Sequence, residues 1–131
     1  MFGKKKKKNN IIKVMHYEGL TDFIQDYPCT IEIKDDIFEI KRIKPETLVT
    51  LNRSQIIKIE MMEEERFMLK FHNEAKRTDK GVKKYYLVVT YRSKENEEKY
   101  LAFWGTAFES GKFLDLQNNF ITTKEQTSYS L

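Results

Sequence analysis

The chain of 131 residues has a single cysteine, Cys29, and this scarcity limits the chemistry available to it. An internal disulfide needs two cysteines and a cysteine-based zinc knuckle needs several, so both are excluded. A reducing compartment is therefore expected. Because Cys29 precedes a β-branched stretch, we expect a buried structural thiol rather than a reactive one.

Histidine is almost as scarce, with only His16 and His72 in the chain. Neither lies in a spacing such as His-Glu-x-x-His, which places two metal ligands on one helical turn. G-x-G-x-x-G, P-loop and G-x-S-x-G motifs are also missing, so nucleotide-dependent enzymes and hydrolases have no support. A catalytic pair in which a histidine activates Cys29 as a nucleophile remains an alternative, but it is disfavoured. We therefore predict a protein that is not an enzyme, with no catalytic residue, metal, cofactor or evident small-molecule substrate.

Long hydrophobic runs are absent too. No stretch of 18 apolar residues occurs, so no membrane-spanning helix is expected. The segment NNIIKVMHYEG interrupts the apolar run after two residues, which leaves no hydrophobic region for a secretion signal. Glycine is third in MFG, so N-myristoylation is not expected either. These features favour a cytoplasmic protein, with peripheral contact at the inner face of the membrane as an alternative.

Positive charge is concentrated near the start of the chain. The net charge is +4, from 24 basic and 20 acidic residues. Lys4, Lys5, Lys6, Lys7 and Lys8 supply five of the basic residues, which leaves 24 − 5 = 19 basic against 20 acidic in the remainder. A protein that binds nucleic acid usually spreads its basic residues over a folded face, so nucleic acid is a disfavoured partner. The five lysines suit either a solvated arm or contact with anionic lipid, to which each adds about 1 kcal/mol near the surface.

Alternation of apolar and polar residues predicts seven or eight short strands. IIKVMHY is the first, and the loop GLTDFIQDYP follows it. In CTIEIKDDIFEIKRI the alternation runs on both sides of Asp35 and Asp36, which predicts a hairpin. TLVTL and QIIKIEMM follow as strands, and in the second Ile57, Ile59 and Met61 are expected to share a face.

The second half of the chain continues the same pattern. Glu63, Glu64 and Glu65 form a charged turn, and the alternation after them predicts a strand with Phe67, Leu69 and Phe71 on one face. HNEAKRTDKG is the longest polar loop. The last two strands have their inward residues at every second position, and these residues are Tyr85, Leu87, Val89, Tyr91, Leu101 and Phe103.

One helix is expected after the strands. Thr106 and Glu109 have the spacing of a capping box, in which the hydroxyl accepts from the amide three residues on and the carboxylate reaches back. Phe113, Leu116 and Phe120 then form an apolar stripe that can close one end of a barrel. The predicted organisation is a basic disordered arm over residues 1–10, one domain over 11–121 and a disordered tail over 122–131.

A meander of about seven strands followed by one capping helix is similar to the pleckstrin-homology (PH) superfold. The stretch GVKKYYLVVTYRSKENEEKYLAFWGTAFESGKFLDLQNNF resembles bacterial PH-like domain proteins. This resemblance implies a mainly β fold, a barrel or sandwich of about seven antiparallel strands capped by a C-terminal α-helix, that acts as a binding scaffold. Many PH domains bind phosphoinositides through basic residues in the first hairpin loop. Asp35 and Asp36 at the clearest early hairpin of this chain argue against that ligand.

Three groups of residues are candidate contacts for a partner. The first is basic and could contact an anion or lipid; it consists of Lys4–Lys8, Lys41, Arg42, Lys44 and Arg53. The second is also basic and belongs to a possible partner-binding loop; it consists of Lys76, Arg77, Lys80, Lys83 and Lys84. The third is aromatic and resembles a base-stacking platform, although barrel closure explains it better; it consists of Tyr100, Phe103 and Trp104.

The function that these features favour is protein–protein interaction or self-assembly by a non-catalytic PH-like module. An extended peptide can add to a sheet edge through backbone hydrogen bonds, so such a binder needs no site motif. Association with anionic lipid through the lysine arm is the alternative.

Overall fold

The computed structural model describes residues 11–75 and 81–128, with side chains as far as Phe120. The predicted basic arm over residues 1–10 lies outside this part of the chain. The described elements are the strands β1 (Ile11–Glu18), β2 (Tyr27–Lys34), β3 (Ile37–Arg42), β4 (Thr47–Asn52), β5 (Ile56–Glu63), β6 (Tyr85–Arg92) and β7 (Glu98–Gly105), the 3-10 helix η2 (Arg53–Gln55), and the helices α1 (Glu64–His72) and α2 (Ala107–Ser128).

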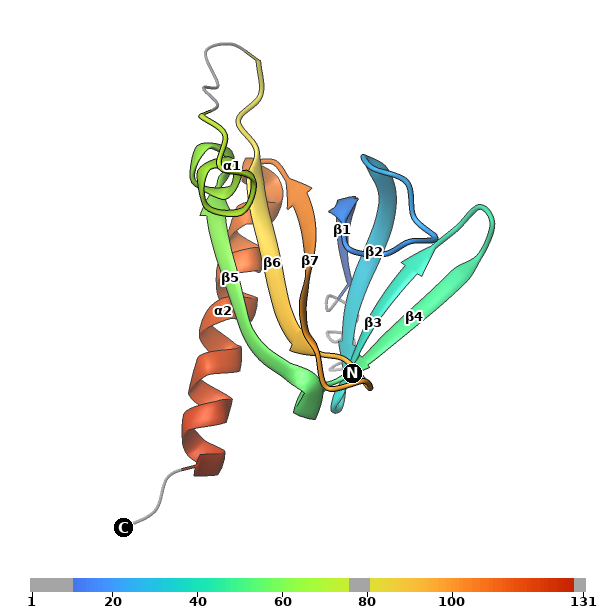
Figure 1. The fold of residues 1–131 in the computed structure, drawn as a ribbon, viewed down its shortest axis with the longest axis vertical. Helices are drawn as coiled ribbons and strands as arrows, with labels where there is room; N and C mark the ends of the chain where they lie inside the picture. The colour runs from blue at the N-terminus through green and yellow to red at the C-terminus, as the bar shows by residue number, and fades with distance from the viewer. Residues whose placement is uncertain (1–10, 76–80, 129–131) are drawn as a thin grey trace, which may run out of the picture.

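All seven strands belong to one antiparallel sheet with the order β4-β3-β2-β1-β7-β6-β5. β1 and β7 join two meanders, and the two parts of the sheet diverge from each other on either side of this pair (Figure 1). The order leaves β4 and β5 as the two edges. The expected mainly β fold with a C-terminal helix is thus confirmed.

The predicted hairpin has its turn where the two aspartates occur. Lys34 is paired with Ile37, so Asp35 and Asp36 alone connect β2 to β3. Asp35 adopts a positive φ of 50°, which two-residue hairpin turns require and which aspartate tolerates better than most residues. The tight turn fixes the register, which places Ile31, Phe38 and Ile40 in the main core.

The main core lies between the inner face of the sheet and α2. The inward residues predicted for β6 and β7 all belong to it or pack against it, including Leu87, Val89 and Phe103. At the start of β5, the prediction of which residues face the core is wrong by one position. A bulge between Ile56 and Lys58 shifts the register, so Ile56 is buried and Ile57 is exposed.

The strand predicted around Phe67 is a helix. α1 packs on the outer face of the sheet and forms a second core there, whose buried residues are Met62, Phe67, Met68, Tyr86, Val88 and Ala102. The Phe67 ring is stacked on Tyr86, with centroids 4.2 Å apart and planes 7° apart. β6 is therefore buried on both faces, which explains its nearly continuous apolar sequence.

Local signals in α1 favour the helix over a strand. Glu64 and Glu65 lie in its first turn and Lys70 in its last, where each charge suits the helix dipole. Asn73 ends the helix in a left-handed conformation, with φ 52°. Phe67 and Phe71 are spaced i and i+4, which fits a helix face as well as a strand face. The charged turn expected at the three glutamates is also wrong, because Glu63 ends β5 and Glu64 is buried.

α2 begins close to the predicted position. The Thr106 N–H donates to Glu109 Oε1 at 2.7 Å, which is half of the expected capping box, whereas the Thr106 hydroxyl accepts from the Phe108 amide at 3.4 Å. Phe113 and Phe120 enter the main core, with Leu116 packed against it. The helix continues past Ile121 as far as Ser128.

Candidate functional site

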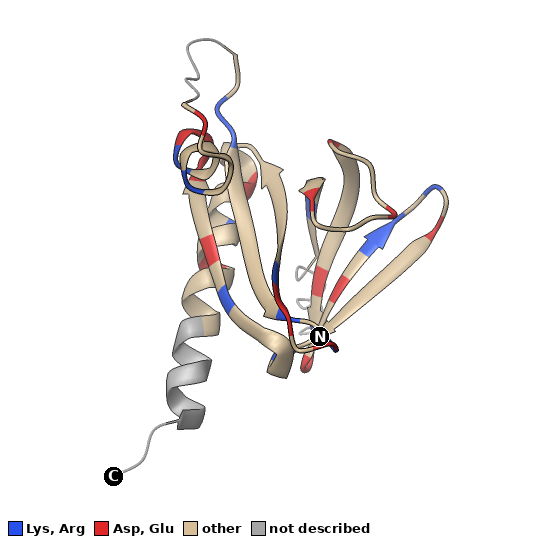
Figure 2. Ribbon diagram, in the orientation of Figure 1, with Lys and Arg blue, Asp and Glu red and all other residues tan. Residues whose placement is uncertain are grey.

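β4 is an uncharged edge strand. Its sequence is TLVTLN, and its register with β3 is regular from Thr47 to Asn52 without a bulge. Leu48, Thr50 and Asn52 point outwards, and Leu48 is 52 % exposed. β4 itself carries no charge, whereas Figure 2 shows charged residues on the adjacent strand β3, where Lys41 and Glu39 pair with Leu48 and Thr50. Natural proteins protect sheet edges with charges, prolines, bulges or covering elements. Among the described elements, none of these protects the outer side of β4 at Leu48 and Thr50, while at its end the Asn52 N–H donates to Gln55 Oε1 at 3.0 Å.

The opposite edge of the sheet is covered instead. α2 packs mainly on β5, and the Gln117 side chain accepts a hydrogen bond from the Met61 backbone N–H at 2.8 Å. This N–H belongs to an edge strand and needs a partner. α2 therefore occupies the place where a further strand would add to β5, so within residues 11–75 and 81–128 β4 is the accessible edge.

The structure does not bring the first basic group together. Arg42 and Lys44 lie at the β3–β4 turn, whereas Arg53 follows the far end of β4, roughly 17 Å of extended strand away. Arg42 is already used structurally, because its guanidinium donates to the Asp22 carbonyl and to Thr47 Oγ1 and lies 4.7 Å from the Phe23 ring centroid. Lys41 is exposed on β3.

The second basic group is only partly described. Lys76, Arg77 and Lys80, like Lys4–Lys8, lie outside the described residues. Lys83 forms an ion pair with Glu63 at 3.3 Å, and this pairing raises its pKa. The Lys84 ammonium lies 4.3 Å from the Trp104 ring centroid. Both described lysines thus have partners within the fold.

The aromatic group does not form a stacking platform. Phe103 is buried in the main core, whereas Tyr100 and Trp104 pack against the second core on the other face of β7. Trp104 Nε1 donates to Asp26 Oδ1 at 2.8 Å. The three rings therefore serve the packing of the two cores, and the alternation of a strand separates them, while β7 lies inside an open sheet and closes no barrel among the described strands.

Cys29 is buried in the main core, as expected. Burial raises the pKa of its thiol to about 12, so the thiolate needed for nucleophilic chemistry does not form near neutral pH. His16 cannot serve as its base, because both ring nitrogens are used: Nδ1 donates to the Ile24 carbonyl at 3.1 Å and Nε2 accepts from the Leu20 amide at 3.2 Å.

His72 lies on the outer face, at the end of α1. Its Nε2 is 2.8 Å from Glu18 Oε2, and the same carboxylate oxygen accepts a hydrogen bond from the Tyr100 hydroxyl. This group ties α1 to β1 and β7. Within residues 11–75 and 81–128, no cluster of three or more histidine, cysteine or acidic side chains is arranged to hold a metal ion.

No family model and no curated protein matches this chain. Among the helices of the described part, none is long and apolar enough to cross a membrane.

The buried His16 predicts a specific pH dependence of stability. Desolvation lowers its pKa below the usual 6.5, so the folded protein holds the ring neutral while the unfolded chain binds a proton below pH 6.5. The free energy of unfolding should thus fall as pH decreases from 6.5 towards the lowered pKa, by at most about 1.4 kcal/mol per pH unit from this group.

Urea denaturation between pH 7.5 and 5.5 measures this effect. His16→Gln should be less stable at pH 7.5, and its stability should change less with pH than that of the original chain. His72→Gln is the matched control and should keep the pH dependence due to His16. An unchanged slope in His16→Gln contradicts the prediction.

Proposed function

We propose that the protein is a non-catalytic binding module that takes up an extended protein segment along β4, and that β4 of a second copy is this segment. The observation that supports this proposal most directly is the difference between the two sheet edges. β4 has six uncharged residues in regular register with β3, whereas α2 covers β5. Seven antiparallel strands followed by a helix also support the proposed PH-like character of the module, in which the sheet serves as a scaffold.

The geometry of a strand constrains how two copies can pair. In a two-fold antiparallel arrangement, facing residues must lie on the same side of the combined sheet. Leu48 can therefore face Thr50 or Asn52, which point outwards as it does. No like charges meet in either register, because β4 has none. Backbone hydrogen bonds over six residues make a small interface, so we expect association that depends on protein concentration.

A lysine at the second residue of β4 should prevent this association. Leu48→Lys places a charge on the edge, as natural edge strands do, and desolvating it opposes strand pairing. Light scattering coupled to size-exclusion chromatography should show a growing dimer fraction for the original chain at high concentration, in low and high salt alike, and a monomer for Leu48→Lys.

Leu69→Lys is the matched control. Leu69 is 60 % exposed on α1, so the same chemical change occurs at a similarly exposed site away from the edge. This variant should dimerise like the original chain. A monomeric original chain at every concentration, or equal behaviour of the two lysine variants, contradicts self-assembly through β4.

A further inference from the structure

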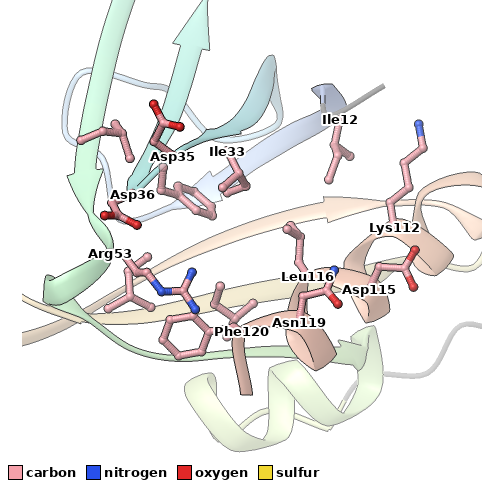
Figure 3. A pocket seen from close by; sticks show the side chains of 14 residues that line it. Ile12, Ile33, Asp35, Asp36, Arg53, Lys112, Asp115, Leu116, Asn119 and Phe120 are labelled. Atoms are coloured by element: carbon pink, nitrogen blue, oxygen red, sulfur yellow. The ribbon is translucent and has the colours of Figure 1, made fainter. Parts of the chain in front are cut away.

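The sheet has a hollow on each face, and the two hollows differ in charge. On the inner face, a cavity of about 380 Å³ lies between the β2–β3 turn, η2 and α2 (Figure 3). Its charged lining residues are Asp35, Asp36, Asp115, Arg53 and Lys112. Their net charge is 2 − 3 = −1. On the outer face, a groove of about 640 Å³, the outer groove, lies between β1, β2, the β3–β4 turn and the start of α2. Its charged lining residues are Lys13, Lys44 and Glu109, with a net charge of 2 − 1 = +1.

The floor of the outer groove is a row of side chains across three strands. Met15 of β1 is paired with Pro28 of β2 on one side and with Trp104 of β7 on the other. Directly paired residues point to the same face, and Trp104 packs against the second core on the outer face. Lys13 precedes Met15 by two residues, so the alternation of the strand places it on this face too. Ile43, which is 62 % exposed, adds an apolar side chain from the β3–β4 turn.

Two carboxylates at the outer groove are already engaged by the fold. Glu109 Oε1 accepts hydrogen bonds from the Thr106 N–H at 2.7 Å and from the Thr106 hydroxyl at 3.1 Å. Asp26, beside the groove, accepts a hydrogen bond from Trp104 Nε1 at 2.8 Å. A cationic ligand would have to compete with these donors for either carboxylate.

The lysines at the outer groove are accessible to a ligand. Lys13 and Lys44 are exposed, and neither ammonium has an ion-pair partner among the residues that the structure describes. Lys84 lies beside the groove, with its ammonium 4.3 Å from the Trp104 ring centroid. These charges attract an anionic head group, and because they are exposed, the attraction should weaken with salt.

We propose that the outer groove binds a long-chain carboxylate, a fatty-acid anion with one apolar chain. The carboxylate is bound by Lys13 and Lys44, and the chain lies along Met15, Pro28 and Trp104. Since a water molecule occupies about 30 Å³ in the liquid, the groove has room for roughly twenty non-hydrogen atoms, enough for one such chain. Burial of the chain provides most of the affinity. β4 contributes no residue to the lining, so the site is independent of the proposed assembly.

Dodecanoate and dodecyltrimethylammonium, each below its micelle concentration, test the proposal on the full chain, because they share a chain length and differ in the sign of the head group. Trp104 is the single tryptophan of the chain and lines the groove, so its fluorescence reports occupancy. Dodecanoate should shift the emission to shorter wavelength in a saturable titration and bind at least tenfold more tightly than the cation. The proposal is overturned by the absence of a saturable response to dodecanoate, by tighter binding of the cation, or by binding only to vesicles of an anionic phospholipid.

Three variants locate the site. The double substitution Lys13→Gln and Lys44→Gln should weaken dodecanoate binding at least tenfold without weakening that of the cation. Lys112→Gln, which removes a positive charge from the inner cavity, is the matched control and should leave both affinities unchanged. Equal dodecanoate affinity in these two variants overturns the proposal. Thr30→Phe should abolish binding by filling the groove. If the double variant fails to fold, Thr30→Phe decides alone, and unchanged dodecanoate affinity in that variant overturns the proposal.

Discussion

Replacement of Phe67 with alanine is expected to lower the free energy of unfolding by about 3–5 kcal/mol. The Phe67 side chain is fully buried, stacked on Tyr86 at 4.2 Å and in edge contact with Tyr17 at 5.6 Å. Its removal leaves a cavity under α1 and takes away the central ring of the second core. Urea denaturation followed by circular dichroism measures the loss.

The matched control is Leu69→Ala, two residues further along α1. Leu69 is largely exposed, so its truncation should change the stability by less than about 0.5 kcal/mol. The pair also distinguishes the helix from the strand that the alternation predicts. In a strand, residues 67 and 69 would share a face and both truncations would be costly. Similar losses for the two variants would contradict the helical structure of this segment.

Replacement of Phe113 with alanine should also cost about 3–5 kcal/mol. Phe113 is a fully buried side chain of α2 and contributes to the main core between the helix and the sheet. Its loss weakens the packing of α2 on the inner face, including the contact that covers the β5 edge. The variant should therefore show a lower midpoint in thermal and urea denaturation.

Phe108 provides a control of the same residue type on the same helix. It is 91 % exposed, so Phe108→Ala removes the same atoms without opening a cavity. Its free energy of unfolding should remain within about 0.5 kcal/mol of that of the original chain. If both phenylalanine variants lost the same stability, α2 would not be packed through the face that contains Phe113.

Much of the fold could be predicted because the signals are local. The turn at Asp35 and Asp36 fixes the register of its own hairpin, and the Thr106–Glu109 pair marks the start of α2. The inward positions of β6 were also predictable, since Leu87 and Val89 follow the period of two along one strand. In each case the pattern depends only on residues that are close together in the sequence.

α1 shows where this reasoning fails. Phe67, Leu69 and Phe71 fit a period of two, while Phe67, Met68 and Phe71 fit the helical period, so a short apolar segment supports both structures. The choice between helix and strand depended on whether the Leu69 side chain is buried. Only packing against Tyr17 and Tyr86, which are distant in sequence, makes the helical face the buried one.

The candidate sites depended almost entirely on such long-range contacts. Basic residues were the strongest sequence signal, yet Arg42 is used within the fold and Arg53 lies at the other end of β4. The free edge had a sequence signal in the uncharged TLVTLN. Its accessibility, however, depends on strand order, and the outer groove depends on how β1 pairs with β2 and β7.

By itself the sequence determined the strands, their tight turn, the final helix and the absence of familiar catalytic motifs, because these follow from neighbouring residues. The tertiary structure decided that α1 is a helix, that Gln117 and α2 cover β5 while β4 stays open, and that the outer groove forms beside Trp104. These outcomes require residues far apart in the chain to be buried together, and the energy of that burial is not contained in any local pattern.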